Sequence, residues 1–134
     1  MTDIPKMAPV KGGVVTYINV DGVVKAIEFY QKAFGAELAA MMPPDDSGRT
    51  MHAHIYVNGT SIMLSDFYPE HGMPKLAPQG YTLTIMSQDI DAEFKRAVDA
   101  GAKPVTEPQD MFWGDRFGAL KDPWGVAWAL NQGK

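Results

Sequence analysis

The sequence of 134 residues contains no cysteine. Disulfides, thiolate nucleophiles and iron–sulfur clusters are therefore excluded. Basic residues are also scarce, with 12 Lys and Arg against 16 Asp and Glu, so there is no positive field to hold a nucleic acid. No apolar run approaches the length that crosses a bilayer, and the first residues lack the apolar core of a signal peptide. These absences favour a cytoplasmic enzyme or small-molecule binder.

Hydrophobic residues make up 46% of the chain, which is enough for the core of a single domain. Apolar residues recur at helical spacing in two segments and predict helices over residues 23–34 and 90–100. Each segment follows an aspartate that can cap the helix and precedes a glycine that can end it. These residues are Asp21, Asp89, Gly35 and Gly101.

Eight further segments are rich in β-branched and alternating apolar residues, as strands are. They are residues 14–20, 36–42, 50–57, 61–66, 81–86, 103–106, 116–120 and 125–131. Asn58-Gly59 is a strong signal for a two-residue hairpin turn. Residues 67–79 are rich in Pro, Gly and His and predict a long loop. The element order β-α-β-β-β therefore occurs twice.

Landmarks of the two halves repeat at an offset of 66 residues. This offset places Gly35-Ala36 on Gly101-Ala102 and Asn58-Gly59 on Trp124-Gly125 without a gap. We expect an α+β protein with an N-terminal arm and one domain of two βαβββ modules. The predicted ranges are 1–13 for the arm, 14–131 for the domain, and about 14–66 and 80–131 for the modules.

Several motifs resemble those of the vicinal oxygen chelate superfamily, which contains glyoxalases, bleomycin-resistance proteins and extradiol dioxygenases. They are AIEFY at 26–30, AFGA at 33–36, MHAHI at 51–55, FWGDR at 112–116 and DPWG at 122–125. The last three resemble the PhnB-like branch, whose members are labelled 3-demethylubiquinone methyltransferase-like. The chain has no glycine-rich nucleotide loop, so we reject transfer from S-adenosylmethionine.

The resemblance implies a glyoxalase/bleomycin-resistance/dioxygenase-like fold. Each module would contribute a curved four-stranded sheet, and two sheets would enclose a small-molecule cavity within one chain or across a homodimer. Metal-dependent members hold a divalent ion through residues on the first and last strands of each half. The matching positions here are Val15, Met63, Tyr81 or Thr82, and Ala129. Three of the four lack a hard ligand, so we expect no metal cofactor there.

A metal site at another place stays open as an alternative. His52 and His54 are two residues apart on a predicted strand and should point to the same face. Two histidines on one strand can begin a Zn or Fe(II) site, but a third ligand must come from elsewhere. The candidates are Asp66, Glu70, His71 and Asp115. Otherwise both histidines bond to neighbouring groups or water.

The stretch Phe112–Arg116 is the most distinctive of the chain and suits the rim of a ligand cavity. Arg116 could clamp a carboxylate or phosphonate, and Asp115 could act as a base or orient that arginine. Alternatively, Asp115 and Arg116 pair to fix the loop above a core Trp113. The strand-end Asp66 could be a site residue or cap the following turn.

The predicted cavity therefore has a mostly apolar wall with a few polar candidates. Its candidate residues are His52, His54, Asp66, Trp113, Asp115 and Arg116. The first hypothesis is a homodimer that binds a small apolar or aromatic molecule without a metal. The second is a lyase, isomerase or dioxygenase with a metal at His52 and His54, or with metal-free acid–base chemistry from Asp115. The third is a regulatory module without a ligand.

Overall fold

The computed structural model describes residues 8–134, which form two compact units. Unit 1 comprises residues 8–31 and 35–75, and unit 2 comprises residues 32–34 and 76–134. The first half of the predicted arm, residues 1–7, lies outside the described residues. No helix in residues 8–134 is long and apolar enough to cross a membrane.

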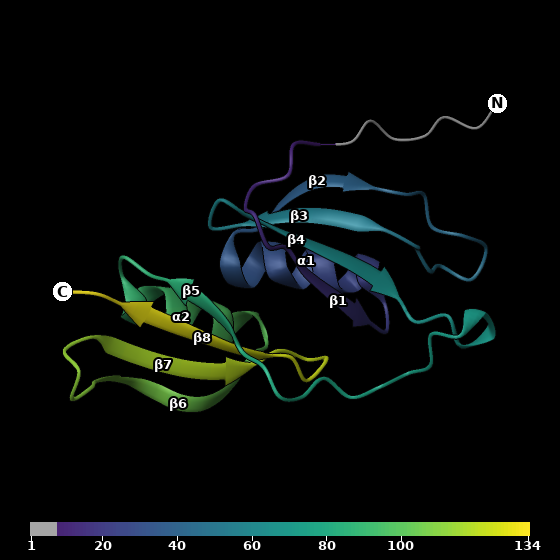
Figure 1. Ribbon diagram of the computed structural model, residues 1–134. Helices are drawn as coiled ribbons and strands as arrows, with labels where there is room; N and C mark the ends of the chain where they lie inside the picture. The colour runs from purple at the N-terminus through teal and green to yellow at the C-terminus, as the bar shows by residue number, and fades with distance from the viewer. Residues whose placement is uncertain (1–7) are drawn as a thin grey trace. The chain divides into compact units, whose positions relative to one another are not determined.

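Each unit follows the order β-α-β-β-β (Figure 1). Unit 1 contains β1 (Thr16–Val20), α1 (Val23–Phe34, except its last three residues), β2 (Glu37–Met41), β3 (Ala53–Val57) and β4 (Thr60–Asp66). Unit 2 contains β5 (Leu83–Met86), α2 (Ile90–Ala100), β6 (Lys103–Asp110), β7 (Arg116–Lys121) and β8 (Ala127–Gln132). The predicted α+β fold of two βαβββ modules is confirmed.

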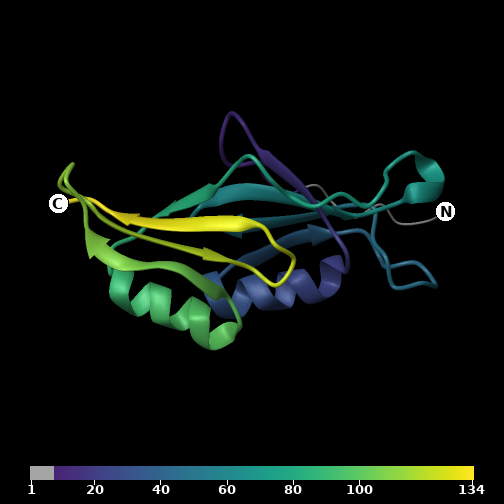
Figure 2. The ribbon, with the colours of Figure 1, turned by 90° about the horizontal axis from the view of Figure 1, so that it is seen from below.

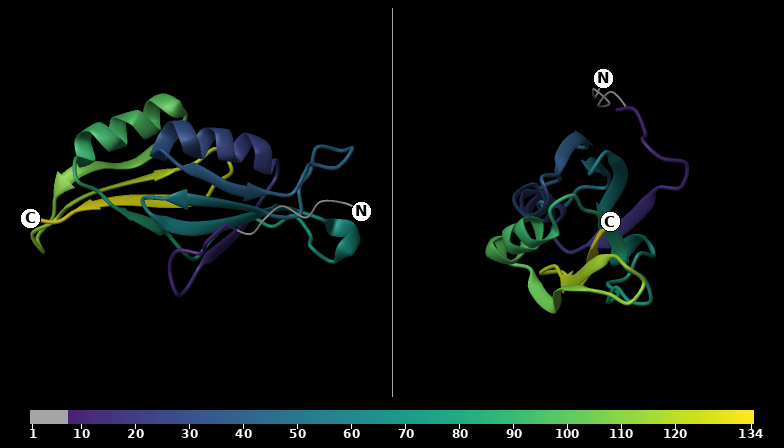
Figure 3. Two further views of the ribbon diagram at one scale, coloured as in Figure 1. Left: turned by 90° about the horizontal axis from the view of Figure 1, so that it is seen from above. Right: turned by 90° about the vertical axis from the view of Figure 1, so that its left-hand side faces the viewer.

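The two sheets have the same topology. Their strand orders are β1-β4-β3-β2 and β5-β8-β7-β6, with the first strand of each unit parallel to the last and the other pairs antiparallel. In each unit the helix runs along one face of the sheet (Figures 2 and 3). We call this the helix-covered face, and the opposite face of the same sheet the open face.

The strand alternation assigns residues to these faces. In unit 1 Ile18 pairs with Leu64 and Ile55 pairs with Ile62, and all four are buried apolar residues of the core beneath α1. Neighbouring residues in a strand point to opposite faces. The residues between them, such as Tyr17, therefore lie on the open face.

Both helices have the predicted bounds, but the predicted cap of α1 is wrong. Asp89 caps α2 by accepting a hydrogen bond from the backbone N–H of Ala92. At α1 the N-cap residue is Gly22, at φ 106°, and not Asp21. Asp66, at the end of β4, accepts from the Gly22 N–H at 2.7 Å instead. A local sequence pattern cannot reveal a cap supplied from 44 positions away.

The strand β6 is longer than the predicted 103–106 because it tolerates irregular pairing. It is the edge strand of its sheet, and its register against β7 shifts between Pro104 and Thr106 and again before Gln109. Proline cannot donate a ladder hydrogen bond and is accommodated at edges and bulges. The predicted loop 67–79 contains one short 3₁₀ turn, Pro69–His71.

The repeat is real, but the gap-free offset of 66 is wrong. The Asn58-Gly59 hairpin is confirmed, with both residues at positive φ as a two-residue turn requires. The corresponding turn of unit 2 is longer, since Lys121 pairs with Ala127 across it. Its residues are held by the Asp122 carboxylate, which accepts from two backbone N–H groups.

Candidate functional site

A row of four side chains crosses the open face of unit 1. Tyr17 pairs with Met63, Met63 with His54, and His54 with Ala40. Each of the four strands contributes one residue, and paired residues of adjacent strands share a face. A methionine thioether therefore lies between an aromatic hydroxyl and an imidazole.

Tyr17 is the residue that sequence reasoning missed. Its side chain is half-exposed, at 49%, and its hydroxyl lies 3.4 Å from both the Met51 carbonyl oxygen and Nδ1 of His52. Burial raises the pKa of the Tyr17 hydroxyl, while a hydrogen bond with Ser65 acts in the opposite direction. The alternation in VVTYINV was sufficient to place Tyr17 opposite the buried Ile18 and Val20.

His54 is buried on the same face, with 2% of its surface exposed. Its Nε2 atom lies 2.7 Å from Oγ of Ser61, and its ring packs edge-on against Tyr56. Burial, followed by the charge of His52, lowers the pKa of His54. The ring is therefore neutral at neutral pH and can serve a ligand as a hydrogen-bonding group.

The next row on this face is also polar. Asn19 pairs with Ser65 across β1 and β4. The Nδ2 atom of Asn19 is buried and has no hydrogen-bond partner among residues 8–134. An unsatisfied buried donor costs about 1–3 kcal/mol. The Asn19 amide can therefore donate a hydrogen bond to a ligand at this end of the face.

The open face of unit 2 is much less polar at its centre. The row that corresponds to Tyr17–Met63–His54–Ala40 contains Thr84, Ala129, Ala119 and Thr106. No ring or charged group stands in this row, and Ala129 is buried. The two modules therefore share a backbone but present different chemistry on equivalent positions.

The Phe112–Arg116 loop is the hairpin tip between β6 and β7. The Met111 N–H donates to the Asp115 carbonyl, and Gly114 adopts the positive φ of 102° that the turn requires. Phe112 is 97% exposed and Trp113 is 49% exposed, so Trp113 is not the core residue that one interpretation of the sequence had suggested. The Trp113 ring lies beside Phe117.

The two charged residues of this motif point to different places. Asp115 accepts a hydrogen bond from the side chain of Asn131 at 2.9 Å. The Arg116 guanidinium binds Asp91 at the start of α2 and Asp110 at the end of β6. Arg116 thus lies on the helix-covered side, where it connects three elements of unit 2.

Asp66 also lies on the helix-covered side, opposite His52 and His54. It is buried, and its carboxylate accepts from the backbone N–H groups of Gly22 and Thr50 at 2.7 and 2.9 Å. These bonds hold the start of α1 and the segment before β3 to the end of β4. Of the sequence-predicted residues of unit 1, the structure therefore brings together only His52 and His54 on one face.

The positions that hold metal in related proteins do not suit a hard divalent ion in this chain. Strand alternation places Met63 and Ala129 on open faces, while Val15 and Thr82 directly precede β1 and β5. A valine and an alanine offer no ligand atom, and a thioether is too soft for Mg, Mn or Fe(II). Within the part of the chain that the structure describes, no three His, Cys, Asp or Glu residues lie together as a metal site requires.

Glu70, a proposed third ligand for the histidines, is engaged elsewhere. Arg49 binds its carboxylate through both terminal nitrogens, at 3.1 and 2.6 Å. This pairing lowers the pKa of Glu70 to about 2. The Arg49 guanidinium also lies over the ring of Tyr68, 4.3 Å from its centre. The cluster fixes the loop after β4 and leaves the Glu70 carboxylate committed to Arg49.

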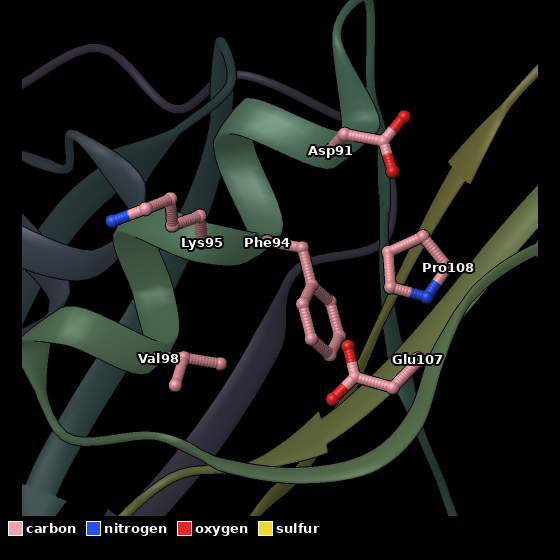
Figure 4. A pocket seen from close by; sticks show the side chains of 6 residues that line it. All are labelled: Asp91, Phe94, Lys95, Val98, Glu107 and Pro108. Atoms are coloured by element: carbon pink, nitrogen blue, oxygen red, sulfur yellow. The ribbon is translucent and has the colours of Figure 1, made fainter.

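Unit 2 also has a shallow groove of about 230 Å³ between α2 and β6 (Figure 4). Its lining residues are Asp91, Phe94, Lys95, Val98, Glu107 and Pro108. The groove is on the helix-covered side and includes none of the residues predicted from the sequence. The Asp91 carboxylate at its rim is bound by Arg116. We therefore seek the site on the open faces.

Comparison with known proteins identifies the family. Residues 12–130 match the glyoxalase/bleomycin resistance protein/dioxygenase superfamily. The chain belongs to this superfamily. An uncharacterized protein of Mycobacterium bovis is 40% identical over 123 residues, which cover 87% of this chain and 80% of that relative.

Two solved structures resemble this chain closely in fold. Protein PA1353 of Pseudomonas aeruginosa superposes with a TM-score of 0.73 at 28% identity, covering 90% of this chain and 96% of its own. TnmS3, an antibiotic binding protein from Streptomyces, superposes with a TM-score of 0.69 at 25% identity, covering 96% of this chain and 98% of its own.

Proposed function

We propose that this protein is a PhnB-like member of the superfamily that binds a small apolar or aromatic molecule without a metal at the usual positions. The observation that carries the proposal is the identity of the residues at the four positions that the family resemblance assigns to metal ligands, Val15, Met63, Thr82 and Ala129. These side chains would leave a hard ion without the ligands that offset its desolvation. They instead offer the apolar contact that a hydrophobic ligand needs.

Polar groups on the open faces would orient the bound ligand through hydrogen bonds. His52 and His54 are the candidates in unit 1, and Trp113 and Asp115 are the candidates in unit 2. Ligand sites are typically apolar with a few polar groups that fix orientation. The likeness to TnmS3, an antibiotic binding protein, supports the binding of a small molecule. We further propose that the protein is a cytoplasmic homodimer.

The proposal is tested by a ligand screen on the purified protein. Ligand-observed NMR with a library of small aromatic and aliphatic compounds should give aromatic hits. Met63→Lys would place a charge in the centre of the open face of unit 1 and should abolish those hits. Met42→Lys places the same charge on a half-exposed methionine outside the strands and serves as the control. Aromatic hits that survive Met63→Lys would contradict the proposal for this face.

The alternative function is a metal-dependent lyase, isomerase or dioxygenase with its ion at His52 and His54. The observation in its favour is that both histidines lie on the open face of unit 1. Elemental analysis of the protein as purified distinguishes the two functions. Stoichiometric Zn, Ni or Fe that disappears in His52→Ala would favour the enzyme over the metal-free binder.

A further inference from the structure

We infer that Tyr17, together with His52, selects ligands that carry an oxygen atom on an aromatic ring, such as phenols and quinones. This inference rests on the proposed function and adds the class of ligand that the site prefers. Tyr17 would be a specificity-determining residue. Its hydroxyl would form a hydrogen bond that a purely hydrocarbon ligand cannot make.

The first argument is the hydrogen bonding of the Tyr17 hydroxyl. The Met51 carbonyl and Nδ1 of His52 are both 3.4 Å away, and the Ser65 hydroxyl is a further hydrogen-bonding neighbour. Hydroxyl hydrogen bonds are normally 2.5–3.0 Å long and weaken beyond that. The contacts with Met51 and His52 are therefore long, and they position the hydroxyl without satisfying it fully. A ligand oxygen at a normal distance would improve its hydrogen bonding.

The second argument is the contrast with Tyr56, on the same sheet. The Tyr56 hydroxyl donates to the Pro9 carbonyl at 2.6 Å, and the Lys11 ammonium lies over its ring. This tyrosine is fully engaged by the chain itself. Tyr17, by contrast, is half-exposed. Of these two tyrosines, Tyr17 is the one that combines a half-exposed ring with long hydroxyl contacts to Met51 and His52.

The surroundings of Tyr17 define the shape of the ligand. Its ring lies 6.0 Å from that of His52, and its strand partner is Met63. Rings and a thioether provide favourable contacts for a flat aromatic molecule. The unpartnered Nδ2 of Asn19, two residues along on the same face, is a further donor. The aromatic rings lie beside polar groups that can bond a ligand, the Tyr17 hydroxyl and the Asn19 amide. This combination suits an oxygenated aromatic compound better than an aliphatic one.

Burial raises the pKa of Tyr17, so the hydroxyl keeps its proton at neutral pH. A neutral hydroxyl can donate to a carbonyl or accept from a phenol. The site is therefore compatible with both the carbonyl oxygen of a quinone and the hydroxyl of a phenol.

The test compares two probes that differ by one hydroxyl, 1-naphthol and naphthalene. We expect the full-length protein to bind 1-naphthol roughly tenfold more tightly, the usual value of one neutral hydrogen bond. Tyr17→Phe keeps the ring and should abolish this preference by weakening 1-naphthol binding while leaving naphthalene binding unchanged. Tyr56→Phe makes the same chemical change on the same sheet and should retain the preference.

Each outcome has a distinct meaning. Equal affinity for the two probes in the unmodified protein, or a preference that survives Tyr17→Phe, would overturn the role of Tyr17 while leaving the proposed function intact. Binding of neither probe would count against the proposed function, and the inference would fall with it. Circular dichroism of both variants verifies that the fold is unchanged.

Discussion

The Nε2 atom of His54 lies 2.7 Å from the Oγ atom of Ser61, on the open face of unit 1. Ser61 also accepts a hydrogen bond from the backbone N–H of Lys11 and donates its own N–H to the Lys11 carbonyl. The contact therefore joins β3 and β4 to the segment before β1. Because His54 is buried and its pKa is lowered, this arrangement depends on pH.

We expect the protein to lose stability as the pH falls below neutral. A histidine whose pKa is lowered on folding binds its proton more readily in the unfolded chain, so the free energy of unfolding decreases as the pH drops below the unfolded value of about 6.5. Urea denaturation between pH 5 and 8 measures this loss. His54→Gln keeps a polar partner for Ser61 and should flatten the curve. Identical pH profiles for the variant and the unmodified protein would contradict this role of His54.

Asp66→Ala should be strongly destabilising, by about 2–4 kcal/mol, because it leaves the Gly22 and Thr50 N–H groups without their charged acceptor. Asp21→Ala is the matched control. Its carboxylate is exposed and pairs with Lys75, an interaction type worth about 0–1 kcal/mol. Urea denaturation of both variants decides which aspartate holds the start of α1. A larger loss for Asp21→Ala would restore the cap that the sequence suggested.

Arg116→Ala distinguishes a structural role from a ligand-binding one. The guanidinium is engaged by Asp91 and Asp110, so we expect a modest loss of stability, as is usual for exposed ion pairs, with ligand affinity unchanged. Thermal denaturation and titration with a ligand from the screen give the two quantities. A loss of about 1.5–3 kcal/mol in binding with unchanged stability would instead support the anion clamp that the sequence suggests.

Divalent ions should not stabilise the protein. A ligand that binds only the folded state raises the melting temperature, and the rise grows with the logarithm of its concentration relative to Kd. Neither added Zn²⁺, Mn²⁺ or Ni²⁺ nor removal of metal with EDTA should therefore shift the thermal transition. A rise with one ion that is lost in His52→Ala would indicate a site at the two histidines.

Light scattering at micromolar concentration should give about twice the 14.7 kDa mass of the chain. Twofold dimers are the commonest oligomers of soluble proteins. Phe112 and Val14 are almost completely exposed, which is costly for large apolar side chains. Phe112→Ser tests whether the hairpin tip takes part in assembly. A monomer of 14.7 kDa at all concentrations would contradict the proposed dimer.

The sequence was most informative where local rules suffice. Apolar spacing identified both helices to the residue, and Asn58-Gly59 identified a hairpin, because both depend on neighbouring positions. Strand ends were less accurate. Residues 14 and 15 have strand character, yet β1 begins at Thr16. A strand extends only as far as the strand that pairs with it. The pairing strand lies elsewhere in the sequence, so the local pattern cannot show where the strand ends.

The candidate site could be predicted only in part for the same reason. His52 and His54 share a face, as their spacing required. The sequence could not show that the Asp66 carboxylate serves backbone groups of distant segments, or that Arg116 binds Asp91, 25 residues away. Tyr17 could have been found, because its strand alternates clearly.

The parallel pairing of β1 with β4 and of β5 with β8 has a consequence for synthesis on the ribosome. In each unit the first strand to be synthesised pairs only with the last one. The sheet therefore cannot form completely until the last strand has been synthesised. Unit 1 can complete its sheet once Asp66 has emerged, whereas unit 2 must await Gln132. During synthesis the sheet of unit 1 would therefore be complete while that of unit 2 is still incomplete. The edge of β5 would stay exposed to chaperones or to a neighbouring nascent chain until β8 has been synthesised.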